Sequence, residues 1–161
     1  MTSMTSNQSS TIDETGFAVR RTIRIAAPIE KVWSAVTQPE HISQWFGKTT
    51  LKGSDVGSTG SITWPDGRTV PLRIEALDEP RSVTYRWNND DVMGEAPGQI
   101  DVERSTEFTF TLDAVSGGTQ LTVVETGFAD TSDPNANMEG HREGWDGELD
   151  KLVALLESGS Q

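Results

Sequence analysis

Few side chains in this sequence could exchange protons near neutral pH. The 161 residues include two histidines, His41 and His141, and no cysteine. His141 lies in the segment GHREGWDGELDKL, residues 140–152, at the edge of an expected apolar helix face. Because the intrinsic pKa of histidine is near neutral, His141 could act as a polar anchor or general base in a pocket. The alternative is a boundary histidine, hydrogen-bonded at the flank of the helix.

The sequence patterns of several common active sites are absent. There is no HExxH motif and no close His/Asp/Glu spacing, which argues against a metal site. The nucleophile motif GxSxG is missing, and the glycines at 57–60 and 94–98 lack the following helix that phosphate-binding loops need. We therefore expect no catalytic residue, no metal and no cofactor.

Large apolar side chains form the main candidate for a binding site. They fall on faces that alternation or helical spacing assigns inward, and they could simply fill a core. Alternatively, they could line a ligand cavity, because the chain has five tryptophans and large rigid rings are typical of cavity walls. With His141, the predicted cavity residues are Trp45, Phe46, Trp64, Tyr85, Trp87, Phe108, Phe110, Met138 and Trp145.

The elements that must position these residues follow from periodicity. Residues 17–27 alternate as a half-buried strand, and helical spacing follows from Pro28. Residues 51–126 read as short strands joined by tight turns, with Pro65-Asp66-Gly67 as a hairpin turn. Residues 88–101 are rich in Asp, Asn, Gly and Pro, and the sequence predicts a long loop there. The first 15 residues are polar and without period, so we expect a disordered tail followed by one domain over 16–158.

The C-terminal segment reads as a long helix from about Asn137 to Glu157. At about 100° per residue, Met138, Trp145 and Leu149 share one apolar face. Gly140, Gly144 and Gly147 fall on the opposite side, so they are expected to thin the outer face of the helix and not to line the cavity.

The charge balance disfavours nucleic acid as a partner. The formal charge is −12, and residues 128–157 carry eight acids against two bases. This acidic helix is either a solvated face or a docking surface for a basic partner. No apolar run approaches the ~20 residues that span a bilayer, and no signal peptide is evident, so we expect a cytoplasmic protein without membrane insertion.

Two motifs carry a family resemblance. RTIRIAAPIEKVWSAVTQPEHISQWFG, residues 21–47, and GHREGWDGELDKLVALLE, residues 140–157, resemble the homologues of the activator of heat-shock protein 90 ATPase. That family belongs to the START and birch-pollen-allergen superfamily (SRPBCC). The resemblance implies an α+β helix-grip fold, in which a curved antiparallel sheet wraps around a long C-terminal helix, with two short helices after the first strand.

The implied fold brings a buried pair of charges together. Arg21 and Glu125 both sit on inward faces of alternating strands, and in this fold the first and last strands are neighbours. An unpaired buried charge is costly, so we expect Arg21 and Glu125 to form a buried ion pair. The pair could be structural or could hold a substrate carboxylate.

For function, the resemblance implies a cavity between sheet and helix. We expect non-catalytic binding of a hydrophobic or aromatic small molecule, of lipid, polyketide or flavonoid type. One alternative is a polyketide cyclase or aromatase using His141, Tyr85 or Arg21. Another is an interaction module with a chaperone partner, in a bacterial stress response. The expected state is a monomer or weak homodimer.

The glycine-rich helix gives a first test. Replacing Gly144 by alanine on an exposed helix face should raise the free energy of unfolding by up to about 1 kcal/mol. Chemical denaturation measures this change. A loss of stability would mean that something packs against this face.

Overall fold

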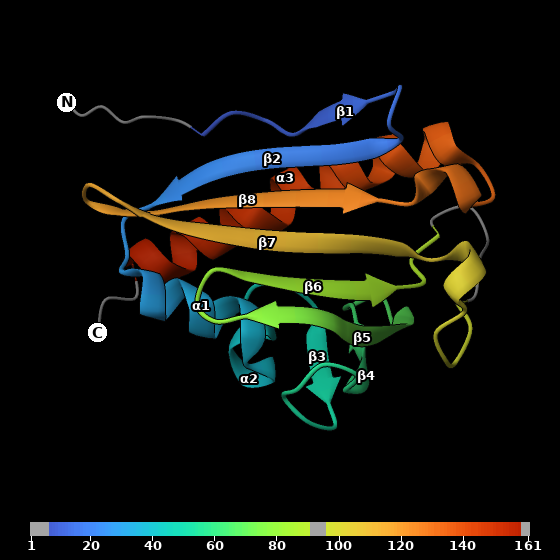
Figure 1. Cartoon of the computed structure of the whole chain (residues 1–161), viewed down its shortest axis with the longest axis horizontal. Helices are drawn as coiled ribbons and strands as arrows, with labels where there is room; N and C mark the ends of the chain where they lie inside the picture. The colour runs from blue at the N-terminus through green and yellow to red at the C-terminus, as the bar shows by residue number, and fades with distance from the viewer. Residues whose placement is uncertain (1–6, 91–95, 159–161) are drawn as a thin grey trace.

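The described residues form one antiparallel sheet and three α-helices (Figure 1). The structure, a computed structural model, describes residues 7–90 and 96–158. The strands are β1 (Thr11–Asp13), β2 (Ala18–Ile25), β3 (Lys48–Leu51), β4 (Thr59–Thr63), β5 (Thr69–Asp78), β6 (Ser82–Trp87), β7 (Thr106–Val115) and β8 (Gly118–Thr126). The helices are α1 (Ile29–Thr37), α2 (Pro39–Ile42) and α3 (Pro134–Ser158), with single 3₁₀ turns η1 (Val102–Arg104) and η2 (Phe128–Asp130).

The strand order makes the first and last long strands of the sheet neighbours, as predicted. The order is β1-β2-β8-β7-β6-β5-β4-β3, so β2 and β8 are neighbours although they are far apart in sequence. Alternation sets the buried face: in β2, Val19, Arg21, Ile23 and Ile25 point inward. The predicted hairpin forms between β4 and β5, which pair from Thr63 with Thr69 outward.

Helix α3 covers the inner face of this sheet. It lies behind β2, β8 and β7 in Figure 1. Asp133 caps its first turn, accepting a hydrogen bond from the Ala136 N–H at 3.1 Å, and Pro134 supplies the preset φ angle of a first helical residue. The apolar face of α3, including Trp145 and Leu149, is buried against the sheet. The arrangement is the predicted α+β helix-grip fold, and α3 begins about one turn earlier than predicted.

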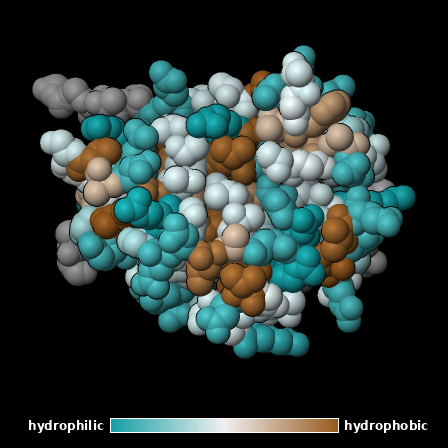
Figure 2. Space-filling model, viewed as in Figure 1, coloured by the Kyte–Doolittle hydropathy of each residue, from teal (hydrophilic) through white to brown (hydrophobic). Residues whose placement is uncertain are grey.

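The outer face of the sheet is polar. Threonine hydroxyls hydrogen-bond across strands there, as Thr22 does with Thr122 and Thr84 with Thr109. Figure 2 shows this face, on which the hydrophobic side chains occur in separate groups among polar and neutral ones. The sheet therefore buries only one face, as antiparallel sheets commonly do.

Part of the expected N-terminal tail is ordered, which corrects the prediction for residues 7–15; residues 1–6 lie outside the described residues. Residues Thr11–Asp13 add β1 to the edge of the sheet beside β2. Ser10 is buried, and its hydroxyl donates to the carbonyl of Arg142 at 2.6 Å and lies 2.6 Å from Asp146 Oδ1. The polar composition of this segment predicts disorder, and it could not reveal the contacts of Ser10 with α3, more than 130 residues away.

These contacts predict that the N-terminal segment stabilises α3. Ser10→Ala removes the hydroxyl that bonds the Arg142 carbonyl and contacts Asp146, and should lower the free energy of unfolding by about 1–2 kcal/mol. Chemical denaturation provides the measurement. Ser9 is exposed, so Ser9→Ala is the matched control and should stay within about 0.5 kcal/mol of the parent. Equal stabilities for the two variants would show that the segment contributes nothing to the fold.

Candidate functional site

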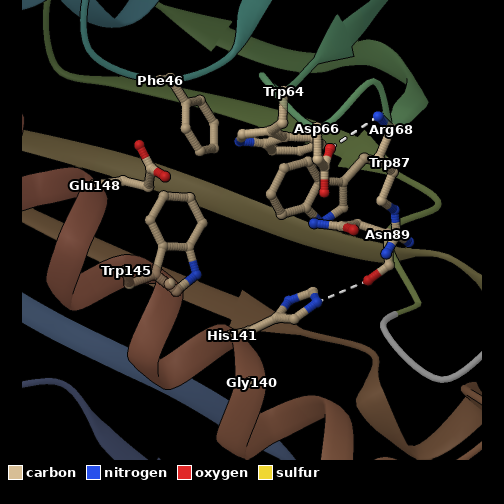
Figure 3. A pocket seen from close by; sticks show the side chains of 11 residues that line it. Phe46, Trp64, Asp66, Arg68, Trp87, Asn89, Gly140, His141, Trp145 and Glu148 are labelled. Atoms are coloured by element: carbon tan, nitrogen blue, oxygen red, sulfur yellow. Dashed lines mark hydrogen bonds between the residues drawn. The ribbon is translucent and has the colours of Figure 1, made fainter.

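A pocket of about 240 Å³ opens between the first half of α3, the loop after β6 and the β4–β5 hairpin (Figure 3). Its walls combine aromatic rings, charged side chains and two glycines of α3. The lining residues are Phe46, Trp64, Asp66, Arg68, Trp87, Asn89, Gly140, His141, Gly144, Trp145 and Glu148.

Four rings, each in contact with at least two of the others, form one wall of the pocket. We call this wall, made of Phe46, Trp64, Trp87 and Trp145, the aromatic floor. The centroid of Phe46 lies 5.9 Å from Trp64, 5.7 Å from Trp87 and 5.6 Å from Trp145. Trp87 and Trp145 stack at 6.0 Å with 27° between their planes. Because the rings touch each other, a ligand would lie on the floor and not between its members.

The floor is oriented by a buried carboxylate, that of Glu125 on β8. Its side chain is wholly inaccessible to solvent. The indole N–H of Trp145 donates to Oε1 at 2.9 Å, and the indole N–H of Trp87 donates to Oε2 at 2.8 Å. Thr106 Oγ1 adds a 2.5 Å contact to Oε2, and His141 Nδ1 lies 2.9 Å from both oxygens. One side chain thus holds residues from β6, β7 and α3.

These donors suit an ionised Glu125, the form that its lowered pKa favours. An indole nitrogen can only donate, so each carboxylate oxygen must accept at least one hydrogen bond. On its other side, His141 Nε2 lies 2.7 Å from the Asn89 carbonyl oxygen, which can only accept (Figure 3). Both ring nitrogens of His141 therefore face acceptors. The proton belongs on His141, and the pair is an imidazolium beside a carboxylate.

The pKa of Glu125 reflects opposing effects. Burial is the largest influence and by itself raises the pKa of this carboxyl group. The charge of His141 opposes it, together with hydrogen bonds from His141, Thr106 and Trp87. The net result is a pKa lowered from its ordinary value of 4.5.

The predicted pairing of Arg21 with Glu125 is wrong. Arg21 is buried on the inner face of β2, but its guanidinium donates to the carbonyl oxygens of Trp145 and Asp146 and to Asp150 Oδ1, the last at 2.8 Å. The inward faces were assigned correctly. Alternation cannot show which residues of α3 lie above each strand. In the structure α3 supplies Asp150 to Arg21 and His141 to Glu125.

The structure divides the ten predicted cavity residues between the pocket and the core. Phe46, Trp64, Trp87, His141 and Trp145 line the pocket. The others are buried in the core, where Trp45, Tyr85, Phe108 and Phe110 surround a void of only about 10 Å³. Burial raises the pKa of the Tyr85 hydroxyl, which donates to the Val36 carbonyl at 2.6 Å. Met138 packs in the same core.

The helix glycines also require a correction. Gly140 and Gly144 line the pocket, although the helical projection placed them away from it. The pocket lies at the edge of α3 and not under its apolar face, so a residue on the flank of the helix reaches it. A Cβ atom added at Gly144 or Gly147 would meet nothing within 4 Å, which agrees with the open space expected there.

Sequence reasoning missed the polar half of the pocket. The sequence pattern indicates Asp66 only as a turn residue and Asn89 only as part of a loop. Glu148 follows His141 by seven residues, which is two helical turns, so its position on the same flank of α3 was a usable signal. Asp90 anchors the pocket loop, because its carboxylate accepts from Ser132 Oγ and Asn137 Nδ2, both at 2.9 Å.

Among residues 7–90 and 96–158, no group of three or more His, Asp or Glu side chains is arranged to hold a metal ion. Within the same ranges, no helix has the length and apolar character needed to cross a membrane.

Comparison with known proteins places this chain among helix-grip domains. The family model described as "Activator of Hsp90 ATPase homolog 1-like protein" matches residues 26–157. A search of curated proteins found no match. The solved structure of protein MLL2253 from Mesorhizobium loti is similar with a TM-score of 0.73 and 28% identity, covering 88% of this chain and 97% of that one.

Two more distant structures share the fold. The Aha1 dimer from Colwellia psychrerythraea matches with a TM-score of 0.66 and 21% identity, over 89% of this chain and 98% of that one. DynU16, described as a putative protein in the dynemicin biosynthetic locus, matches with a TM-score of 0.70 and 24% identity, over 88% of this chain and 48% of that one.

The network around Glu125 predicts a large and pH-dependent effect of its charge. Glu125→Gln removes the charge that balances the imidazolium and turns one acceptor oxygen into an NH2 donor that faces an indole N–H, and it should lower the free energy of unfolding by about 3–5 kcal/mol at pH 7. Because the folded pKa is lowered, the contribution of Glu125 is complete above pH 4.5 and is lost as the pH falls through the folded value. The difference between parent and variant should therefore shrink in acid.

Denaturation at pH 7 and below pH 4 measures both effects. Glu107→Gln is a suitable control, because Glu107 is on the outer face and pairs with Arg86 at 2.5 Å in a partly exposed salt bridge. The control should cost no more than about 1 kcal/mol. A Glu125→Gln variant as stable as this control would contradict the assignment of a buried ion pair.

Proposed function

This chain belongs to the family of activator of Hsp90 ATPase homolog 1-like proteins, and we propose that it binds a small apolar or aromatic molecule on its aromatic floor. The observation that carries the proposal is an open pocket in which a buried carboxylate fixes the orientation of two tryptophans. Rings held in this way present a preorganised surface, which lowers the entropy lost on binding.

The size of the pocket limits the ligand. Sites for drug-sized molecules have volumes of roughly 300–1,000 Å³. At about 240 Å³, the pocket suits a ligand smaller than these, and it is too small to enclose a lipid chain. A small flat aromatic compound fits this space best.

The contacts of the candidate proton-transfer groups support binding without catalysis. Both ring nitrogens of His141 already face acceptors, so this residue is not poised to take a proton from a ligand. The Tyr85 hydroxyl donates to Val36, and Arg21 lies on the β2 side of α3 with its donors directed at α3. A cyclase would need another group at the pocket. A chaperone partner and a weak homodimer remain predictions, since the likeness to the Aha1 dimer at 21% identity shows the fold alone.

A pair of glycine variants tests the site. Gly144 lines the pocket and Gly147, one turn away on the same helix, does not, yet a side chain at either position would begin in open space. Gly144→Leu should fill the pocket and weaken binding of small aromatics by at least about tenfold, whereas Gly147→Leu should leave it unchanged. Both substitutions replace a helical glycine and should raise stability by up to about 1 kcal/mol.

Tryptophan fluorescence can report binding, because Trp64, Trp87 and Trp145 line the pocket. The probes are indole, 2-naphthol and tert-butylbenzene, titrated into the parent and both variants. Calorimetry serves for probes that absorb at the excitation wavelength. If none binds the parent, or if Gly144→Leu binds as well as Gly147→Leu, the proposed function is wrong.

A further inference from the structure

We propose that the pocket selects a small organic cation, a protonated or quaternary amine with apolar substituents, over a neutral molecule of the same shape. This rests on the proposed function and names the class of ligand. It follows from the electron-rich floor, the carboxylates at the rim and the way the positive groups of the pocket are engaged.

Phe46 and Trp64 supply most of the accessible ring surface of the aromatic floor, and Trp87 and Trp145, which are 3% and 2% exposed, turn their polar edges away from the ligand. The N–H groups of Trp87 and Trp145 point at Glu125 and are engaged there. Donation to a carboxylate shifts electron density toward the ring, because hydrogen-bonded groups polarise one another. A cation over such a ring is attracted by its quadrupole, and tryptophan is the strongest aromatic side chain in this respect.

Two carboxylates stand at the rim, on opposite sides of the floor. Glu148 comes from α3 and Asp66 from the β4–β5 hairpin, and Figure 3 shows both beside the rings. Asp66 is exposed, and its Oδ1 accepts from the Arg68 backbone N–H at 2.9 Å. Glu148 lies 2.9 Å from Lys151 Nζ, but this lysine is 58% exposed, so solvent screens the pair.

Both ring nitrogens of His141 and one guanidinium nitrogen of Arg68 are engaged within the protein. Arg68 Nη2 donates to the Asp90 carbonyl at 3.0 Å, and His141 is engaged by Glu125 and Asn89. Within residues 7–90 and 96–158, the acids in and behind the wall are Asp66, Asp90, Glu125 and Glu148, and the cations are Arg68, His141 and Lys151. Four negative and three positive charges leave a net charge of −1 around the pocket, on a chain of net charge −12 that attracts cations at long range.

A matched pair of probes separates the charge of the ligand from its shape. Trimethylphenylammonium and tert-butylbenzene differ in replacing a quaternary nitrogen by carbon. Isothermal titration calorimetry on the full chain should show the cation binding about tenfold more tightly. Added salt should weaken binding of the cation and leave the neutral probe unaffected, because only the charged contact is screened.

Variants at the rim complete the test. Glu148→Gln keeps the shape of the side chain and should weaken the cation a few-fold while leaving tert-butylbenzene unchanged. Glu143→Gln removes the same charge from the same helix at a position that does not line the pocket, and should have no effect on either probe.

The possible results distinguish this inference from the proposed function. If tert-butylbenzene binds as tightly as the cation, or more tightly, the cation preference is overturned and binding of apolar molecules stands. If Glu148→Gln and Glu143→Gln weaken the cation equally, the charge acts at long range and the rim site is overturned. If neither probe binds, the cation preference is overturned, and the proposed function fails as well if indole and 2-naphthol also do not bind.

Discussion

The burial of one carboxylate governs how this domain is put together. Glu125 has no contact with solvent, so its charge is tolerable only if every oxygen lone pair finds a donor. Those donors come from β6, β7 and α3, and each must lie at hydrogen-bonding distance at the same time. Apolar packing alone would allow α3 to slide or rotate over the sheet. The carboxylate gives the sheet and the helix a single mutual position, and the orientation of the aromatic floor is a consequence of it.

A second polar contact compensates for the weakness of α3. Three glycines occupy one stretch of this helix, which intrinsic preference disfavours. Arg21 reaches up from β2 and donates to two carbonyl oxygens of that stretch as well as to Asp150. Next to Arg21, Ser10 donates to the carbonyl of Arg142 and contacts the carboxylate of Asp146. The helix is therefore held by groups outside it, and this is why backbone without side chains can persist beside the pocket.

The fold could be predicted from local patterns, whereas the polar contacts could not. Alternation in β2 and β8 correctly buried Arg21 and Glu125, and helical spacing correctly placed Trp145 toward the sheet. The partners of the two charges depend on the position of α3 along the strands, a quantity that no short sequence window contains. The order of residues 7–15 was missed in part for a related reason, since the partners of Ser10 in α3 are more than 130 residues distant. Half of the predicted cavity residues lie in the core. The sequence could not separate them from the pocket residues, because a ring that packs in the core and a ring that faces the pocket follow the same alternation.

The indoles of Trp87 and Trp145 both stabilise the fold and line the pocket. Some pocket residues can therefore be substituted without loss of stability, and these two cannot. The N–H edges of Trp87 and Trp145 hold the buried carboxylate, while their rings line the pocket, so any replacement alters folding and recognition together. Gly144 contributes to the same pocket but makes no side-chain contact, and Asp66 and Glu148 lie at the rim away from the carboxylate. Related domains could thus acquire new ligands through changes at these positions alone. Ligand specificity would then diverge at little cost in stability, while the hydrogen bonds between the two tryptophans and Glu125 are retained.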